Sequence, residues 1–219
     1  MTEYKREAEG VKLEVWHDHC VDNPRTAYEY FYNVGVMVCR SHRSHVLPSE
    51  LDGFRLDDWE TADEAIKHLK AEYDAVCVLP VWMYDHGDVA LSAGERTYPF
   101  TCGWDSSFAG LIFATRESLE DWPDWTLDKV EEVLKAEVRQ YSQWANGECY
   151  GFTITCPDGD HDYDDYTSYG GFIGWEYAKS EADSAFDHEV KAYVERRDRE
   201  NLNRQHWAER DVVTVGGAA

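Results

Sequence analysis

The chain has few basic residues for its length. It has 44 Asp and Glu residues but only 21 Lys and Arg, which gives a formal net charge of −23 over 219 residues. A surface of this sign repels phosphate backbones, so direct binding of nucleic acid is disfavoured. The same field favours a basic protein partner, including a cleft that otherwise holds nucleic acid. It also suits an ordinary acidic coat that keeps a protein in solution.

Long apolar runs are missing as well. No stretch approaches the ~20 apolar residues of a membrane-spanning helix, and the N-terminal segment MTEYKREAEGVKLEV is charged rather than apolar. We therefore expect no membrane segment, no secretory signal and a cytoplasmic protein. The six cysteines are scattered without a CxxC pair, which predicts free thiols and no disulfide.

Short strands and capped helices are present. Segments rich in Val, Ile and aromatic residues predict strands, and capping residues with apolar periodicity predict helices. The predicted strands are 11–16, 34–39, 75–83, 109–115, 148–155 and 170–177, and the predicted helices are 61–72, 126–145 and 181–201.

We expect these elements to form an α+β fold with one mixed β-sheet and two or three helices packed mainly on one face. The sheet is expected to hold 34–39, 76–82, 109–114 and 149–155, covered by the helices 61–72 and 126–145. No internal repeat divides the chain. We predict a single α+β domain over 1–200 and a polar, flexible C-terminal tail over 201–219.

A polar cluster lies between two of the predicted strands, within residues 83–110. In one hypothesis Cys102 is a nucleophile, His86 is its base and Asp105 orients the base. The apolar setting of Cys102 raises a thiol pKa rather than lowering it, so we favour no catalytic residue.

The favoured hypothesis makes this segment a binding surface. Tyr and Trp combine apolar area with a polar group, which suits protein interfaces. We expect Asp85, His86 and Asp105 to be partly buried and hydrogen-bonded to the backbone of a long loop. The predicted binding residues are Tyr84, Asp85, His86, Trp104 and Asp105.

Two patterns suggest metal ions without completing a known signature. Cys39 and His42 are zinc-type ligands three positions apart, but no CxxC pair accompanies them. Aspartates alternate over 158–164 as in a calcium loop, yet the glycine and the glutamate that an EF-hand needs are missing. We predict no cofactor, with zinc or calcium as alternatives.

The segments DNPRTAYEYFYNVGVMVCRSHR (22–43), LPVWMYDHGDVALSAGERTYPFTCGWDSSFAGLIFATRE (79–117) and LKAEVRQYSQWANGECYGFTI (134–154) follow one another along the chain. In content and order they resemble three blocks of an uncharacterised protein family common in phages and prophages of Gram-positive hosts. The second segment departs from the family pattern. Relatives read Ser-Gly, Pro and Gly-Gln-Val where this chain has Gly87-Asp88, Gly103 and 107–109. The resemblance implies a phage origin but implies no particular activity.

The resemblance and the acidic charge together predict a phage-encoded cytoplasmic protein that binds a host protein, in host takeover or counter-defence. One form of this hypothesis is nucleic-acid mimicry, in which the partner has a basic nucleic-acid-binding cleft. Acidic residues are then expected to gather on one face, contributed by 57–64, 117–124, 128–137 and 158–165. The alternative is a hydrolase or metal-dependent enzyme that uses His86, Cys102 and Asp105. The sequence specifies neither a substrate nor an oligomeric state.

Overall fold

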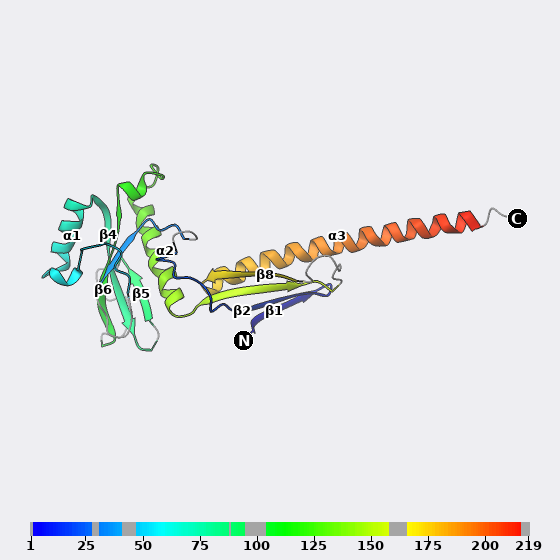
Figure 1. The fold of residues 1–219 in the computed structure, drawn as a ribbon, viewed down its shortest axis with the longest axis horizontal. Helices are drawn as coiled ribbons and strands as arrows, with labels where there is room; N and C mark the ends of the chain where they lie inside the picture. The colour runs from blue at the N-terminus through cyan, green and yellow to red at the C-terminus, as the bar shows by residue number, and fades with distance from the viewer. Residues whose placement is uncertain are drawn as a thin grey trace. The chain divides into compact units, whose positions relative to one another are not determined.

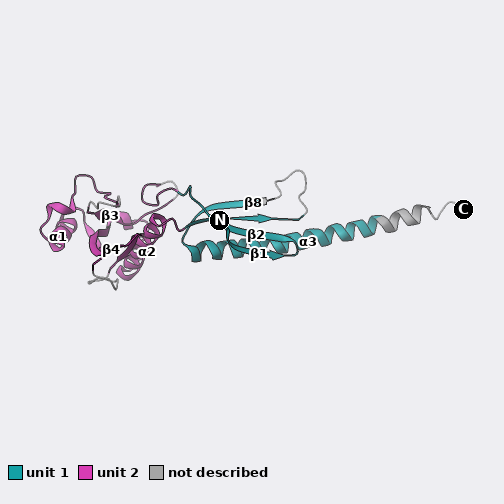
Figure 2. Cartoon of the chain, turned by 90° about the horizontal axis from the view of Figure 1, so that it is seen from below, with its two compact units in different colours: residues 1–21, 149–219 teal, residues 22–148 magenta. Residues whose placement is uncertain are grey.

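The computed structural model describes residues 2–27, 31–40, 47–87, 89–94, 104–157 and 166–215. It contains two four-stranded antiparallel sheets and three α-helices (Figure 1), which confirms the predicted α+β class. The residues group into two compact units (Figure 2). We call 22–148 the central unit, and 1–21 with 149–219 the terminal unit. The sequence predicted one domain over 1–200, whereas the contacts divide this range between two units.

The central unit is a sheet with a helix on each face. Its strand order is β3 (Val36–Cys39), β6 (Ser106–Thr115), β4 (Ala75–Asp85) and β5 (Val89–Ala93). Alternate residues of a strand point to opposite faces, and both faces of β6 are buried, so its residues 109–114 form a continuous apolar run. The short 3-10 helices Leu56–Asp58 and Glu117–Leu119 lie in the connections.

Helix α1 (Ala62–Glu72) covers one face of this sheet. Its buried Ala65 and Leu69 share a core with Leu111 and Phe113 of β6. The side chain of Thr61 accepts a hydrogen bond from the backbone N–H of Glu64, so Thr61 caps the N-terminus of this helix.

Helix α2 (Leu127–Ala145) covers the other face. Its buried stripe, formed by Val130, Leu134 and Val138, packs with Ile112 of β6. Thr126 caps the helix by accepting from the backbone N–H of Lys129. The residues of β6 that face α2 alternate with those that face α1, as the period of a strand requires.

The terminal unit is a sheet with one long helix on one face. Its strand order is β1 (Thr2–Ala8), β2 (Val11–His17), β7 (Cys149–Thr155) and β8 (Tyr166–Ile173). Glu9 and Gly10, both at positive φ, turn β1 into β2. Alternate residues of β2 are buried, and this apolar face packs on α3 (Trp175–Val215). The α3 residues in this core are Ala178, Ala182, Phe186 and Tyr193.

Three details of the structure differ from the predicted architecture. The expected single mixed sheet is two antiparallel sheets, because 149–155 pairs with β2 of the terminal unit rather than with β6. The helices 61–72 and 126–145 lie on opposite faces of their sheet rather than on one. The predicted polar tail over 201–219 begins inside α3, which continues to Val215.

Within the described residues, no helix has the length and apolar composition of a membrane span. The five described cysteines, Cys20, Cys39, Cys77, Cys149 and Cys156, are free thiols.

Candidate functional site

The predicted binding residues gather at one end of the central sheet, which we call the β4–β6 end. Tyr84 and Asp85 are the last residues of β4, and Asp105 precedes the first residue of β6. Tyr84 pairs with Ser106, and the backbone N–H of Asp85 donates to the carbonyl of Asp105 at 2.9 Å. The antiparallel register of β4 and β6 therefore brings together residues about 20 positions apart in the sequence.

A side-chain pair extends this end of the sheet. Nδ1 of His86 lies 3.3 Å from Oδ2 of Asp105, and the rings of Tyr84 and His86 are 6.2 Å apart. The His86 side chain is 72% exposed, against 32% for Asp105. The expected partial burial of Asp85 and Asp105 is confirmed, whereas that of His86 was wrong. His86 lies beyond the last residue of β4.

Trp104 is the most exposed large hydrophobic residue described, at 98%. It directly precedes Asp105 in the chain, and Asp105 is the residue that pairs with His86. An indole in solvent loses the favourable transfer free energy that burial would give it. Its polar N–H and large apolar area are the properties found at the centres of protein interfaces.

The catalytic hypothesis has part of its geometry here. A carboxylate that orients an imidazole is the base half of a nucleophilic site, and Asp105 and His86 form such a pair. Cys102, the proposed nucleophile, lies outside the described residues.

Of the two residues suggested as zinc ligands, the structure describes Cys39, and its setting does not suit a metal ion. Cys39 is buried in the core, and burial, with a smaller contribution from Glu50, raises the pKa of its thiol to about 12. A zinc ligand must be a thiolate, which this setting disfavours. His42 lies outside the described residues, as do the aspartates over 158–164. In the part of the chain that is described, no three His, Cys, Asp or Glu side chains are arranged to hold a metal ion.

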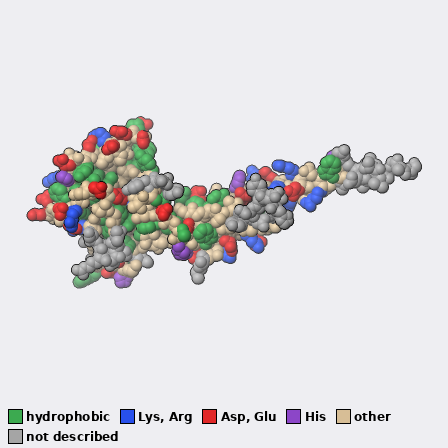
Figure 3. Space-filling model, viewed as in Figure 1, with side chains coloured by type: hydrophobic (Ala, Val, Ile, Leu, Met, Phe, Trp, Pro, Cys, Tyr) green, Lys and Arg blue, Asp and Glu red, His purple; other side chains and the backbone are tan. Residues whose placement is uncertain are grey.

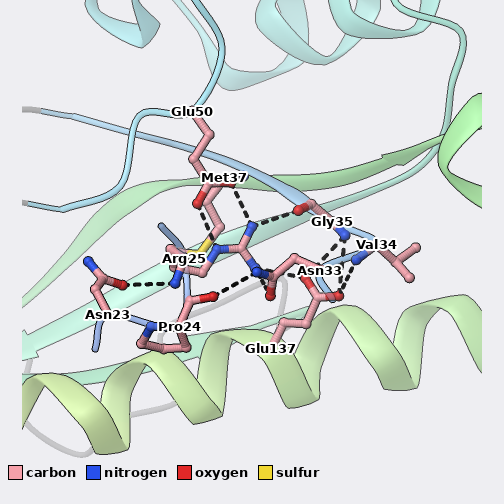
Figure 4. Close-up of polar contacts among 9 residues, drawn as sticks. All are labelled: Asn23, Pro24, Arg25, Asn33, Val34, Gly35, Met37, Glu50 and Glu137. Carbon is pink, nitrogen blue, oxygen red and sulfur yellow. Dashed lines mark hydrogen bonds and ion pairs between the residues drawn. The ribbon is translucent and has the colours of Figure 1, made fainter. Parts of the chain in front are cut away.

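A second polar site was not foreseen from the sequence. Arg25, from the DNPR stretch, is 2% exposed and lies between Glu50 and Glu137 (Figure 4). Its Nε and Nη2 donate to the two carboxylate oxygens of Glu50 at 2.7 and 2.6 Å. Nη1 donates to Glu137 at 2.8 Å and to Asn33 at 2.9 Å, and Nη2 also donates to the carbonyl of Gly35 at 2.6 Å. These contacts use all five N–H donors of the guanidinium.

Glu137 receives donors from a second direction. The backbone N–H of Val34 donates to its Oε1 at 2.7 Å, and that of Gly35 donates to its Oε2 at 3.1 Å. Burial raises the pKa of Glu137, while Arg25 and the two N–H groups act in the opposite direction. Burial lowers the pKa of Arg25, but the hydrogen bonds and charges of Glu50 and Glu137 outweigh it, so this pKa lies above its usual range.

The Arg25 cluster holds separate parts of the chain together and is not a ligand site. No donor of the guanidinium remains for a bound molecule, and its partners come from three parts of the chain: the segment 33–35, the segment at residue 50 and α2. A Cβ on Gly35 would lie 2.5 Å from Cδ2 of Leu134 and 2.8 Å from Oε2 of Glu137, so only glycine allows this approach. No local pattern in the sequence points to this cluster, because Glu137 is 112 positions away from Arg25.

The cluster also joins two of the segments singled out in the sequence, 22–43 and 134–154. Arg25 belongs to the first of them and Glu137 to the second. Comparison of the chain with protein-family models, with curated proteins and with solved structures finds no match.

Proposed function

We propose that the protein acts by binding another protein through the β4–β6 end, with Tyr84, Asp85, His86, Trp104 and Asp105 as the contact residues. The observation that carries this proposal is the exposure of Trp104 beside an exposed histidine and a half-buried carboxylate. Trp is the residue most enriched among those that dominate binding energy, and hydrogen-bonding groups around it fix the orientation of a partner. Tyr84 and Asp85 lie in β4, and the hydrogen bond from Asp85 to Asp105 ties the start of this surface to the sheet, which holds contact residues more rigidly than a free loop does.

The charge supports a basic partner. The central unit carries 24 acidic and 11 basic residues. Figure 3 shows acidic side chains beside hydrophobic ones on its visible face. Attraction between opposite fields speeds association and is screened over about 8 Å at physiological ionic strength. A cleft that otherwise holds nucleic acid would supply the positive field, with no direct contact between this chain and nucleic acid.

The resemblance to phage proteins suggests where the protein would act and what it would bind. A phage-encoded protein of this kind would work in the cytoplasm of the host, where it would bind a host protein in takeover of the cell or in counter-defence. The support is the order of the three segments in the sequence together with the negative charge.

A hydrolase is the second candidate, because His86 and Asp105 form the base and orienting pair that a nucleophile needs. In this case Cys102 would attack the substrate, and the β4–β6 end would be an active site instead of an interface.

Capture of host proteins on the immobilised chain tests the proposal. We expect Trp104→Ala to weaken capture of the partner by about 30-fold, the effect of losing an interface residue worth ~2 kcal/mol. Leu202→Ala is the matched control, since Leu202 is an exposed hydrophobic residue on α3 of the terminal unit. Raising the salt concentration should slow association of the partner with both variants.

Two results would contradict the proposal. One is capture by Trp104→Ala that equals capture by the unchanged chain. The other is loss of function in Cys102→Ala while capture and thermal stability are kept, which would favour the hydrolase.

A further inference from the structure

Three aromatic rings form a second exposed cluster on the central unit. The ring of Tyr32 meets that of Trp122 edge to face with 5.1 Å between centroids, and Trp122 stacks on Trp125 at 4.8 Å. Tyr32 comes from the segment before β3, whereas both tryptophans lie between the second 3-10 helix and α2. We call these three residues the aromatic platform.

The platform is fixed on one side and open on the other. Trp122 and Trp125 are half-buried, because they pack against the core under α2. Tyr32 is 70% exposed although Trp122 holds its ring. Packing within the chain therefore accounts for the two tryptophans but leaves most of the Tyr32 side chain open to solvent.

The chain around the platform is acidic, and the two basic residues that flank it, Arg116 and Lys129, are paired with Asp74 and Glu132. Residues 117–128, ESLEDWPDWTLD, contain five carboxylates and no Lys or Arg. All five are exposed, and none makes an ion pair with another described residue. They are Glu117, Glu120, Asp121, Asp124 and Asp128. Asp121 and Asp124 directly precede Trp122 and Trp125, so negative charge adjoins the rings along the chain.

An aromatic surface with carboxylates around it is complementary to a cation. A ring face attracts a positive charge through its quadrupole, and a carboxylate adds a charge-assisted hydrogen bond. Arginine suits both contacts better than lysine, because its planar guanidinium stacks on rings and is more weakly hydrated than an ammonium group.

We propose that the aromatic platform and its acidic surroundings bind an arginine side chain of a basic partner protein. The surface is separate in chain position from the β4–β6 end, and this inference does not depend on the function proposed for that end.

Titration with short peptides tests the proposal. The probes are tetra-arginine and tetra-lysine peptides, followed through the indole N–H resonances that Trp122→Phe and Trp125→Phe assign. We expect tetra-arginine to shift both resonances and to bind more tightly than tetra-lysine. Tyr32→Ala changes a side chain that is 70% exposed, and it should weaken tetra-arginine binding about fivefold, as the loss of one cation–π contact predicts.

A charge-matched control separates the surface from the overall field. Asp121→Asn with Asp124→Asn removes two charges beside the platform, and Asp52→Asn with Glu60→Gln removes two exposed charges elsewhere on the same unit. Only the first pair should weaken binding strongly. Equal weakening by both pairs would overturn the proposal, and so would unchanged binding in Tyr32→Ala. Trp104→Ala should leave peptide binding unchanged, so failure here is distinct from failure of the β4–β6 end.

Discussion

Nη1 of Arg25 lies 2.8 Å from Oε2 of Glu137, although 112 positions separate the two residues in the chain. Both side chains are at least nine-tenths buried, at 2% and 8% exposure. Charges in such a setting are stable only when every hydrogen-bonding group has a partner. The pair meets this condition through Glu50, Asn33 and the backbone around Gly35.

We expect Arg25→Met to lower the free energy of unfolding by about 3–5 kcal/mol, because Glu50 and Glu137 would keep buried charges without their partner. Arg25→Lys should restore little, since an ammonium group has three donors where the site uses five. Unfolding in urea, followed by circular dichroism, measures both changes.

A surface pair provides the control. Arg116 bonds Asp74 at 2.9 Å with both side chains mostly exposed, so Arg116→Met should cost less than about 1 kcal/mol. Adding Glu137→Gln to Arg25→Met should cost less than the sum of the single changes. An Arg25→Met chain as stable as Arg116→Met would show that the buried pair contributes little to the fold.

The elements that the sequence predicted best are those whose ends carry local signals. The helices expected over 61–72 and 126–145 are observed as Ala62–Glu72 and Leu127–Ala145, and Thr61 and Thr126 cap their first turns. Capping depends on residues three positions apart, which a sequence displays directly.

Two strands were missed for physical reasons. β1 has four charged residues among its seven, as an edge strand does when it resists pairing with other chains, and Thr2 is its one β-branched residue. β5 has only five residues. The third helix was predicted to begin at 181 and begins at Trp175, because 170–177 is aromatic and was assigned to a strand.

The residues of each site could not be grouped from the sequence, because their contact partners lie far apart along the chain. The register of β4 and β6 places Asp85 opposite Asp105, which no local pattern indicates. Arginine is rarely buried, so the DNPR stretch gave no reason to expect Arg25 in the core. The aromatic platform likewise joins Tyr32 to Trp122 across 90 positions.

Side chains at the end of α2 hydrogen-bond to the outer edge of β5, the edge that pairs with no described strand of its sheet. Oδ1 of Asn146 accepts from the N–H of Val89 at 2.8 Å, and Nδ2 donates to the Val89 carbonyl at 2.7 Å. Oγ of Ser142 accepts from the N–H of Leu91 at 2.9 Å. Side chains of α2 therefore satisfy backbone groups that another strand would otherwise pair.

Asn146→Ala should expose this edge. We expect a loss of about 1–2 kcal/mol in the free energy of unfolding and faster hydrogen exchange at the Val89 amide, because its N–H loses its acceptor. Gln143→Ala, at a half-buried position of the same helix, should leave Val89 exchange unchanged. Equal exchange in the two variants would mean that Asn146 does not protect β5.

Stability at alkaline pH depends on two buried groups near the Arg25 cluster. Burial is the main cause that raises the pKa of Cys39 from its usual 9.0 to about 12, and that of Tyr141 from 10.0 to about 12. Glu50 acts on both in the same direction, and Arg25 acts against it. Both groups are therefore neutral in the folded protein across a pH range in which the unfolded chain ionises.

The sign of the pH dependence follows from this difference. Between about pH 9 and 12 the folded state binds more protons than the unfolded state, so the free energy of unfolding falls as the pH rises. The stabilisation is complete below about pH 9 and is lost as the pH passes through about 12. Since a tenfold change in proton affinity equals ~1.4 kcal/mol, the upper limit for Cys39 is on the order of 4 kcal/mol.

Urea unfolding at a series of pH values between 7 and about 11 measures this slope. Cys39→Ala with Tyr141→Phe lowers stability at every pH, because packing is lost, but it should flatten the alkaline decline. Some decline should persist, since burial also raises the pKa of Cys77 and Cys156. A decline as steep in the double variant as in the unchanged chain would show that the alkaline loss of stability arises outside Cys39 and Tyr141.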